Sequence, residues 1–165
     1  MDNGWFSRRQ FVSGTAATGL LFAGQSLLSS SAAAQSEPLI LEAVPGKAKL
    51  QDEVDAMTSI WGYGGAVPGP LIRVKRGSEV WVRLKNGLPQ PTTIHWHGIR
   101  IDNAMDGVAH LTQKAVPPGE TFDYRFRAPD AGTFWYHPHN LSWEQVARGL
   151  YGALNVDDET SVDVD

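Results

Sequence analysis

Residues 78–86 read SEVWVRLKN, a stretch in which every second side chain is a branched aliphatic one. Because successive side chains of a β-strand point to opposite faces, Val80, Val82 and Leu84 predict a strand with one face in a core. Residues 121–129, TFDYRFRAP, show the same period of two with aromatic side chains. Two such strands favour sheets that have one buried face and one exposed face.

Segments rich in glycine and proline separate the strand patterns at short intervals. They are residues 62–70 (GYGGAVPGP), 85–91 (KNGLPQP), 116–120 (VPPGE) and 128–132 (APDAG). Gly and Pro supply the backbone conformations of tight turns, so we expect short strands joined by turns. No long stretch with a period of 3.6 residues competes, and residues 141–150 have room for one or two helical turns. The pattern predicts an all-β sandwich or barrel.

The composition limits the kinds of protein that this chain can be. It has 165 residues, 42% hydrophobic and 19% charged, which is typical of one globular domain. The formal net charge is −4 and no basic cluster follows residue 10, which argues against a nucleic-acid binder. The sequence has no cysteine, which excludes disulfides, thiol nucleophiles and Cys-ligated metals. Any metal would therefore need His, Asp or Glu ligands.

Residues 1–34 predict an export signal that precedes the folded domain. A polar start with Arg8 and Arg9 leads into an uncharged middle section and an Ala-rich end that resembles a signal-peptidase site. Glycine and hydroxyl side chains dilute the middle section, so a stable membrane span is not expected. Residues 7–12, SRRQFV, resemble a twin-arginine export signal, and the alternative is an ordinary basic segment. We therefore expect a periplasmic or secreted protein.

Four of the five histidines form two His-X-His pairs, His95 with His97 in IHWHG and His137 with His139 in WYHPHN. Residues i and i+2 of an extended strand face the same side, about 6.5–7 Å apart. Each pair can therefore reach one metal ion or two adjacent ions. Neutral imidazole favours copper, zinc, nickel or iron over magnesium or calcium. With no carboxylate interleaved, the pairs favour copper or zinc.

Three other interpretations of the pairs fit less well. Hydrogen-bonded strand histidines would be expected for a lone His, but not for two pairs flanked by aromatic residues. The zinc-hydrolase pattern His-X-His-X-Asp-His is excluded, because HWHGIR lacks both the Asp and the third His. A cupin metal site is closer, with Asp102 near the offset of its carboxylate. Cupins do not repeat the pair, however, and the glycine expected beyond is Ala109 here.

Four segments resemble the first cupredoxin domain of the multicopper oxidase family, which includes laccases, ascorbate oxidases and bacterial cuprous oxidases. They are VPGPLIRVKRGSEVWVRLKNGL, TTIHWHGI, MDGVAHLTQKAVPPGETFDYRF and AGTFWYHPHNLSWEQVARGLYGAL, in that order. The resemblance covers about residues 39–156 and implies an all-β, cupredoxin-like Greek-key β-sandwich. We expect a single such domain over residues 35–156, after the twin-arginine-type signal peptide over 1–34, and an acidic tail or truncated linker over 157–165.

The resemblance implies that the two pairs supply four of the eight histidines of a trinuclear copper cluster, which reduces O2 to water. His95 would bind the type 2 copper. His97 and His137 would bind one type 3 copper, and His139 the other. Asp106 matches an acidic residue that helps to deliver protons in bacterial members, and its alternative role is a plain Asp-Gly turn.

Other residues near the motifs have less specific expectations. His110 matches no ligand position and is expected in a surface loop. Trp96, Trp135 and Tyr136 are expected to pack around the ligands. The chain also departs from the family, because it lacks the Cys that holds the mononuclear copper through which electrons enter. The motifs that carry the other four cluster histidines are absent as well.

We therefore expect the copper-binding N-terminal domain of a multicopper oxidase, an oxidoreductase that couples substrate oxidation to reduction of O2. It would be a fragment or a truncated reading frame, completed by further cupredoxin domains or a partner chain. Whether the chain alone is an enzyme stays open, because it lacks the Cys and half of the cluster ligands. The alternative is a stand-alone periplasmic module that binds or delivers copper without turnover.

Overall fold

The computed structural model describes residues 37–53 and 55–159. The predicted export signal over residues 1–34 lies outside these ranges. Within the described ranges, no helix has both the length and the apolar character needed to cross a membrane.

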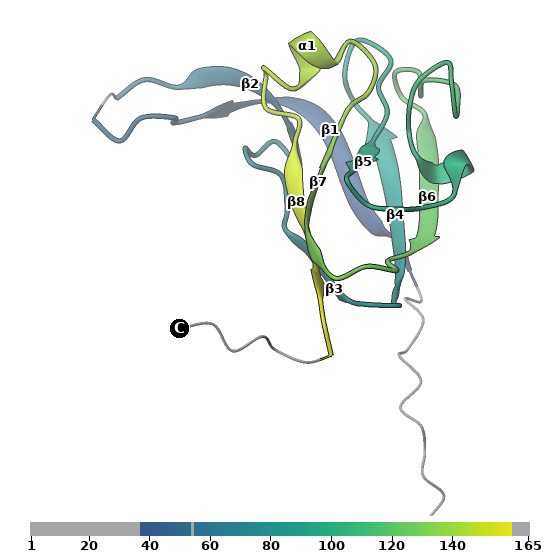
Figure 1. Ribbon diagram of the computed structural model, residues 1–165. Helices are drawn as coiled ribbons and strands as arrows, with labels where there is room; N and C mark the ends of the chain where they lie inside the picture. The colour runs from purple at the N-terminus through teal and green to yellow at the C-terminus, as the bar shows by residue number, and fades with distance from the viewer. Residues whose placement is uncertain (1–36, 54, 160–165) are drawn as a thin grey trace, which may run out of the picture. The chain divides into compact units, whose positions relative to one another are not determined.

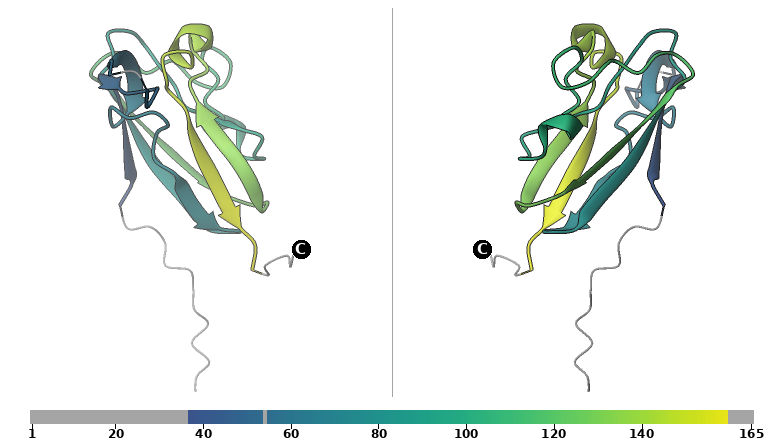
Figure 2. Two further views of the ribbon diagram at one scale, coloured as in Figure 1. Left: turned by 90° about the vertical axis from the view of Figure 1, so that its left-hand side faces the viewer. Right: turned by 90° about the vertical axis from the view of Figure 1, so that its right-hand side faces the viewer.

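Two four-stranded sheets form the domain (Figure 1), and Figure 2 shows them as separate layers. The first sheet contains, in order, β2 (Thr58–Tyr63), β1 (Leu39–Ala48), β4 (Glu79–Asn86) and β6 (Thr121–Arg127). The second contains β3 (Ile72–Lys75), β8 (Gly152–Asp157), β7 (Gly132–His137) and β5 (His95–His97). The β1–β4 and β3–β8 pairs are parallel, and the other pairs are antiparallel. The expected all-β, cupredoxin-like Greek-key sandwich is confirmed.

Among the residues that the structure describes, helical structure is limited to short segments in the connections. A 3-10 turn, η1 (Asn103–Met105), lies between β5 and β6, and α1 (Ser142–Gln145) lies between β7 and β8. The one or two helical turns expected over residues 141–150 are therefore present as a single turn.

The two strand patterns found in the sequence form neighbouring strands. β4 and β6 pair antiparallel, with Val82 opposite Tyr124. Val80, Val82 and Leu84 are each at most 1% exposed, and Tyr124 is fully buried. The period of two in the sequence is thus the alternation between the inner and outer faces of this sheet.

Trp96 anchors β5 to the opposite sheet. Its fully buried ring packs edge-on against Tyr124 and Phe126 of β6, with ring centroids 5.7 Å and 4.9 Å away. The Tyr124 hydroxyl also accepts a hydrogen bond of 2.8 Å from the backbone N–H of Ile94. Because aromatic rings bury large apolar areas, Trp96 fixes which face of β5 points inward. The neighbouring residues His95 and His97 must therefore point to the outer side of the second sheet.

The last strand includes the first residue of the run expected as an acidic tail. β8 ends at Asp157, whose carboxylate accepts from Nε of Arg73 at 2.8 Å, and Asp158 pairs with Arg76 at 3.3 Å. The first two residues of the expected acidic tail are therefore attached to β3 and the turn after it. Residues 160–165 lie outside the described ranges.

Candidate metal centre

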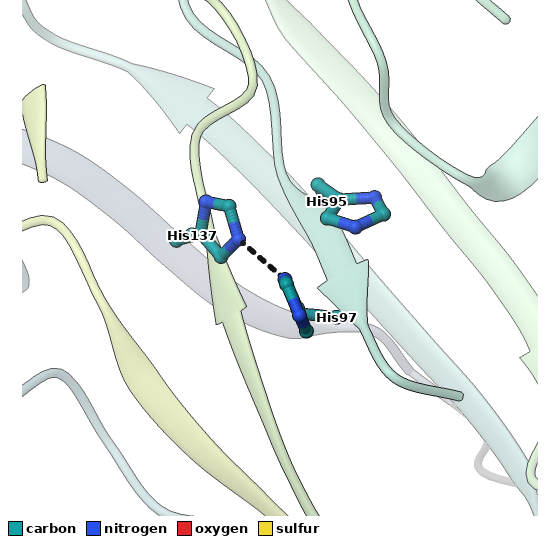
Figure 3. Close-up of side chains that lie close together, drawn as sticks. All are labelled: His95, His97 and His137. Atoms are coloured by element: carbon teal, nitrogen blue, oxygen red, sulfur yellow. Dashed lines mark hydrogen bonds between the residues drawn. The ribbon is translucent and has the colours of Figure 1, made fainter. Parts of the chain in front are cut away.

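Three histidines meet on the outer side of the second sheet (Figure 3). His95 and His97 come from β5, and His137 is the last residue of β7, directly opposite His95 in the strand register. One ring nitrogen from each lies within 4.8 Å of the others. The strand pairing thus brings together histidines of the two motifs that are 40 positions apart in the chain.

Two ring nitrogens in this cluster face each other directly. Nδ1 of His97 and Nε2 of His137 are 3.2 Å apart, as the dashed line in Figure 3 marks. Imidazole nitrogens lie about 2.0–2.1 Å from a bound zinc ion, so two of them on one ion at an angle of about 100° are about 3.2 Å apart. The observed separation therefore fits two ligands of a single ion.

Backbone carbonyls determine which ring nitrogen of His95 and of His137 carries the proton. Nδ1 of His95 lies 2.8 Å from the carbonyl oxygen of Asp106, and Nδ1 of His137 lies 2.9 Å from that of Pro138. A carbonyl oxygen only accepts, so both Nδ1 atoms must carry the proton and both Nε2 atoms are free to bind. Metal-binding histidines commonly have such a partner on their second nitrogen.

His137 is also held in its neutral form. Burial lowers its pKa to about 4, an effect to which repulsion from His95, His97 and His139 adds. The hydrogen bond to the Pro138 carbonyl opposes this shift without reversing it. The ring is therefore neutral near pH 7, which is the form that binds metals.

His139 lies beside the group of three. Its ring centroid is 5.2 Å from that of His95 and 6.3 Å from that of His137. Its backbone N–H donates to the hydroxyl of Thr93 at 3.0 Å, and its backbone bridges to Val108. The fourth predicted ligand therefore borders the cluster on the side of His95.

Asp106 contacts His95 from the turn that follows η1. Besides its backbone carbonyl, its carboxylate Oδ1 lies 3.4 Å from Nδ1 of His95, and the side chain is 30% exposed. Gly107, with φ of +77°, allows this approach, because a Cβ there would lie 1.7 Å from the carbonyl oxygen of Ile94. Asp106 is thus an Asp-Gly turn residue and also a direct neighbour of the cluster.

The three aromatic residues of the motifs lie on different faces. The indole of Trp135 stacks on His137, with ring centroids 4.0 Å apart, and contacts His97 at 5.0 Å. Trp96 and Tyr136 instead pack together in the core beneath the sheet. The expectation of packing around the ligands is met directly by Trp135, which precedes His137 by two residues and so shares its face.

Some polar residues near the site were missed in the sequence. Thr93 is fully buried and holds His139, and Gln145 is fully buried between the two motifs. Gln145 accepts from the hydroxyl of Thr92 at 2.7 Å and donates to the carbonyl of Pro91 at 2.9 Å. The available signal was the TT doublet at residues 92–93, separated from the first pair by Ile94 alone, at a position where a strand core would be apolar.

His110 lies where the sequence analysis expected it. It is exposed in a turn, has a φ of +67°, and donates its backbone N–H to Gln113 at 2.8 Å. It does not belong to the group of three clustered histidines.

Comparisons with known proteins agree on one family. Residues 46–161 match the family model described as multicopper oxidase. The chain is 38% identical over 158 residues to copper resistance protein A of Pseudomonas syringae pv. tomato, covering 92% of this chain and 26% of that protein. It is 48% identical over 98 residues to multicopper oxidase MmcO of Mycobacterium tuberculosis, covering 59% and 19%.

A solved structure is also similar to this chain. Lac15 from a marine microbial metagenome matches with a TM-score of 0.73 and 50% sequence identity, over 78% of this chain and 34% of that one. The chain spans only about a quarter or less of the length of these two curated relatives.

Proposed function

Because this chain belongs to the multicopper oxidase family, we propose that it is the copper-binding N-terminal domain of such an oxidase. Its two His-X-His pairs would supply half of the histidines of a three-copper centre. The observation that carries the proposal is the facing pair of nitrogens, Nδ1 of His97 and Nε2 of His137, at 3.2 Å. Tautomer selection at His95 and His137 by backbone carbonyls supports it further.

The division of the ligands among the ions is the one that the family resemblance implies, and the facing nitrogens of His97 and His137 support one part of it. His97 and His137 would bind one type 3 copper. His95 would bind the type 2 copper through Nε2, and His139, whose ring centroid is 5.2 Å from that of His95, would bind the other type 3 copper. When bound, copper in this family supplies the redox chemistry that reduces O2 to water.

Asp106 would hold protons next to the centre. Its carboxylate lies 3.4 Å from Nδ1 of His95 and is 30% exposed, so it can exchange protons with water. Oxygen reduction consumes protons, and a carboxylate between solvent and the centre can deliver them. The backbone carbonyl of the same residue meanwhile keeps His95 in the tautomer that binds through Nε2.

Other polypeptide segments would complete the enzyme. His97 and His139 are both exposed, which leaves the outer side of the cluster open to further ligands. The sequence has no cysteine for the mononuclear copper that receives electrons. A further cupredoxin domain, on the same or a partner chain, would therefore contribute the remaining histidines, the Cys and the site for the reducing substrate.

A second candidate is copper binding or delivery without turnover. The relative that covers 92% of this chain is named a copper resistance protein, which supports a role in handling the metal itself. Coexpression with a domain that carries the missing Cys and His motifs separates the two candidates. The oxidase predicts oxygen uptake with a phenolic or cuprous substrate in the combined protein, and the delivery module predicts none.

Copper titration of the purified chain tests the site itself. His97→Ala and His137→Ala should each remove the tightest copper site seen by calorimetry, whereas His110→Ala should leave it unchanged. The chain alone should show no intense blue thiolate absorption and should consume no more oxygen than free copper. Equal loss in all three variants would mean that the binding is adventitious.

Export through the twin-arginine route is a further part of the proposal. Replacing both Arg8 and Arg9 by Lys keeps the charge but removes the pair that this route reads. The precursor should then stay in the cytoplasm. Normal processing of the Lys-Lys variant would assign the chain to the general secretory route instead.

A further inference from the structure

His97 is held differently from the other two histidines of the cluster. His95 and His137 each donate Nδ1–H to a backbone carbonyl. Within the described part of the chain, no carbonyl or carboxylate holds His97, whose Nδ1 instead faces Nε2 of His137. Since those two nitrogens would bind the same ion, that hydrogen bond cannot orient His97 once copper is bound. Something else must keep the exposed His97 ring in place.

Trp135 is the residue placed to do this. It is the direct cross-strand partner of His97 and precedes His137 by two residues on the same face of β7. Its ring lies 4.0 Å from that of His137, at an interplanar angle of 28°, and 5.0 Å from that of His97, at 36°. One flat side chain thus contacts both rings whose nitrogens face each other.

The position of Trp135 shows that it does not fill the core between the sheets. The residue is 38% exposed and lies on the outer side of the sheet, whereas Trp96 and Tyr136 fill the interior below it. A smaller side chain at position 135 would open no cavity between the sheets. It would give the two imidazoles room to rotate away from each other.

We propose that Trp135 is a positioning residue that clamps the His97 and His137 rings in the orientation required to bind one copper ion. The inference rests on the proposed copper binding. The clamp takes the place of the missing carbonyl partner of His97 and persists when the hydrogen bond between the two rings is replaced by bonds to the metal.

The test compares copper affinity in variants of the purified full chain, with Cu(II) titrated against a chelator. Trp135→Leu removes the flat ring and should weaken the tight site about tenfold, since changes to residues that orient metal ligands typically cost 10- to 100-fold in affinity. Trp135→Phe retains a flat ring and should restore most of the affinity. Trp143→Leu is the matched control, because Trp143 is 77% exposed on α1.

Two further measurements distinguish positioning from general damage. Thermal unfolding without copper should be the same for Trp135→Leu and the original chain. The electron paramagnetic resonance spectrum of the first bound Cu(II) should change in Trp135→Leu and return to the original form in Trp135→Phe.

The possible failures are distinct. If Trp135→Leu binds copper as tightly as the original chain while His97→Ala does not, Trp135 has no positioning role and the proposed function stands. If His97→Ala also binds normally, the proposed copper site fails and the clamp fails with it. If Trp135→Leu unfolds at a much lower temperature and Trp135→Phe restores neither stability nor affinity, the residue is merely structural.

Discussion

The two His-X-His segments are attached to the rest of the domain by different kinds of contact. The first is anchored by apolar packing, since Trp96 between its two histidines packs into the core against Tyr124 and Phe126. The end of the second is held by polar contacts: the hydroxyl of Thr93 accepts from the backbone N–H of His139, and the buried amide of Gln145 ties α1, which follows this pair, to Thr92. We therefore expect that losing a core contact displaces the first pair, whereas losing a polar contact releases the His139 end of the second pair locally.

Trp96→Ala tests the apolar anchor and should have the largest effect. Removing a fully buried Trp costs about 3–5 kcal/mol of unfolding free energy, because it leaves a large cavity between the sheets. Urea denaturation followed by circular dichroism measures the loss. Trp143→Ala, at an exposed position of α1, is the control and should change stability by less than about 0.5 kcal/mol. A similar small loss in both variants would mean that packing does not anchor the first pair.

Gly107→Ala should have the next largest effect and should act first on the contact with the first pair. The added Cβ would lie 1.7 Å from the Ile94 carbonyl oxygen, and the alanine backbone would have to keep a φ of +77°. The turn must therefore move away from β5. We expect a cost of about 2–4 kcal/mol from the backbone strain and overpacking combined. The His95 imidazole signals in NMR spectra should shift because the Asp106 carbonyl withdraws. Unchanged His95 signals would show that this carbonyl does not hold the ring.

Gln145→Leu tests the polar anchor. The fully buried amide bonds Thr92 and Pro91, and its loss removes both hydrogen bonds from a buried site, which should cost about 1–3 kcal/mol. Amide hydrogen exchange should accelerate around His139 and not in β5. Equal acceleration in both segments would mean that the two anchors are a single cooperative unit.

Thr93→Val should have the smallest effect. Valine keeps the shape but removes the oxygen that accepts from the backbone N–H of His139. Because His139 is exposed and water can replace the contact, we expect about 0.5–1.5 kcal/mol. Copper titration should show weaker binding of the ion that His139 contacts, while the ion bound by His97 and His137 is unaffected. A loss as large as that of Trp96→Ala would contradict the comparison.

The sequence predicts which side chains of a strand share a face, because this follows from the period of two along the strand. Val80, Val82 and Leu84 point inward as their alternation requires, and the histidines of β5 share a face for the same reason. Contacts across the sheet were not predictable in this way. The hydrogen bond from His139 to Thr93 joins residues 46 positions apart and depends on how the strands align.

The same limit applies to the end of the domain. Asp157 belongs to an acidic run that the sequence suggests is solvated. Its partner, Arg73, lies 84 positions earlier in the chain, so the sequence does not show the ion pair. Charge pattern alone does not show that β3 and β8 pair in parallel, which is what brings the two side chains together.

The length of β5 has a consequence for association between molecules. β5 is an edge strand of its sheet and has only three residues, after which Gly98 turns the backbone away with a φ of +87°. Long, flat edge strands invite another chain to add to the sheet, and proteins limit this by keeping such edges short. Three residues suffice to send two imidazoles outward and one indole inward. β5 therefore presents its ligands while offering little backbone on which aggregation could begin.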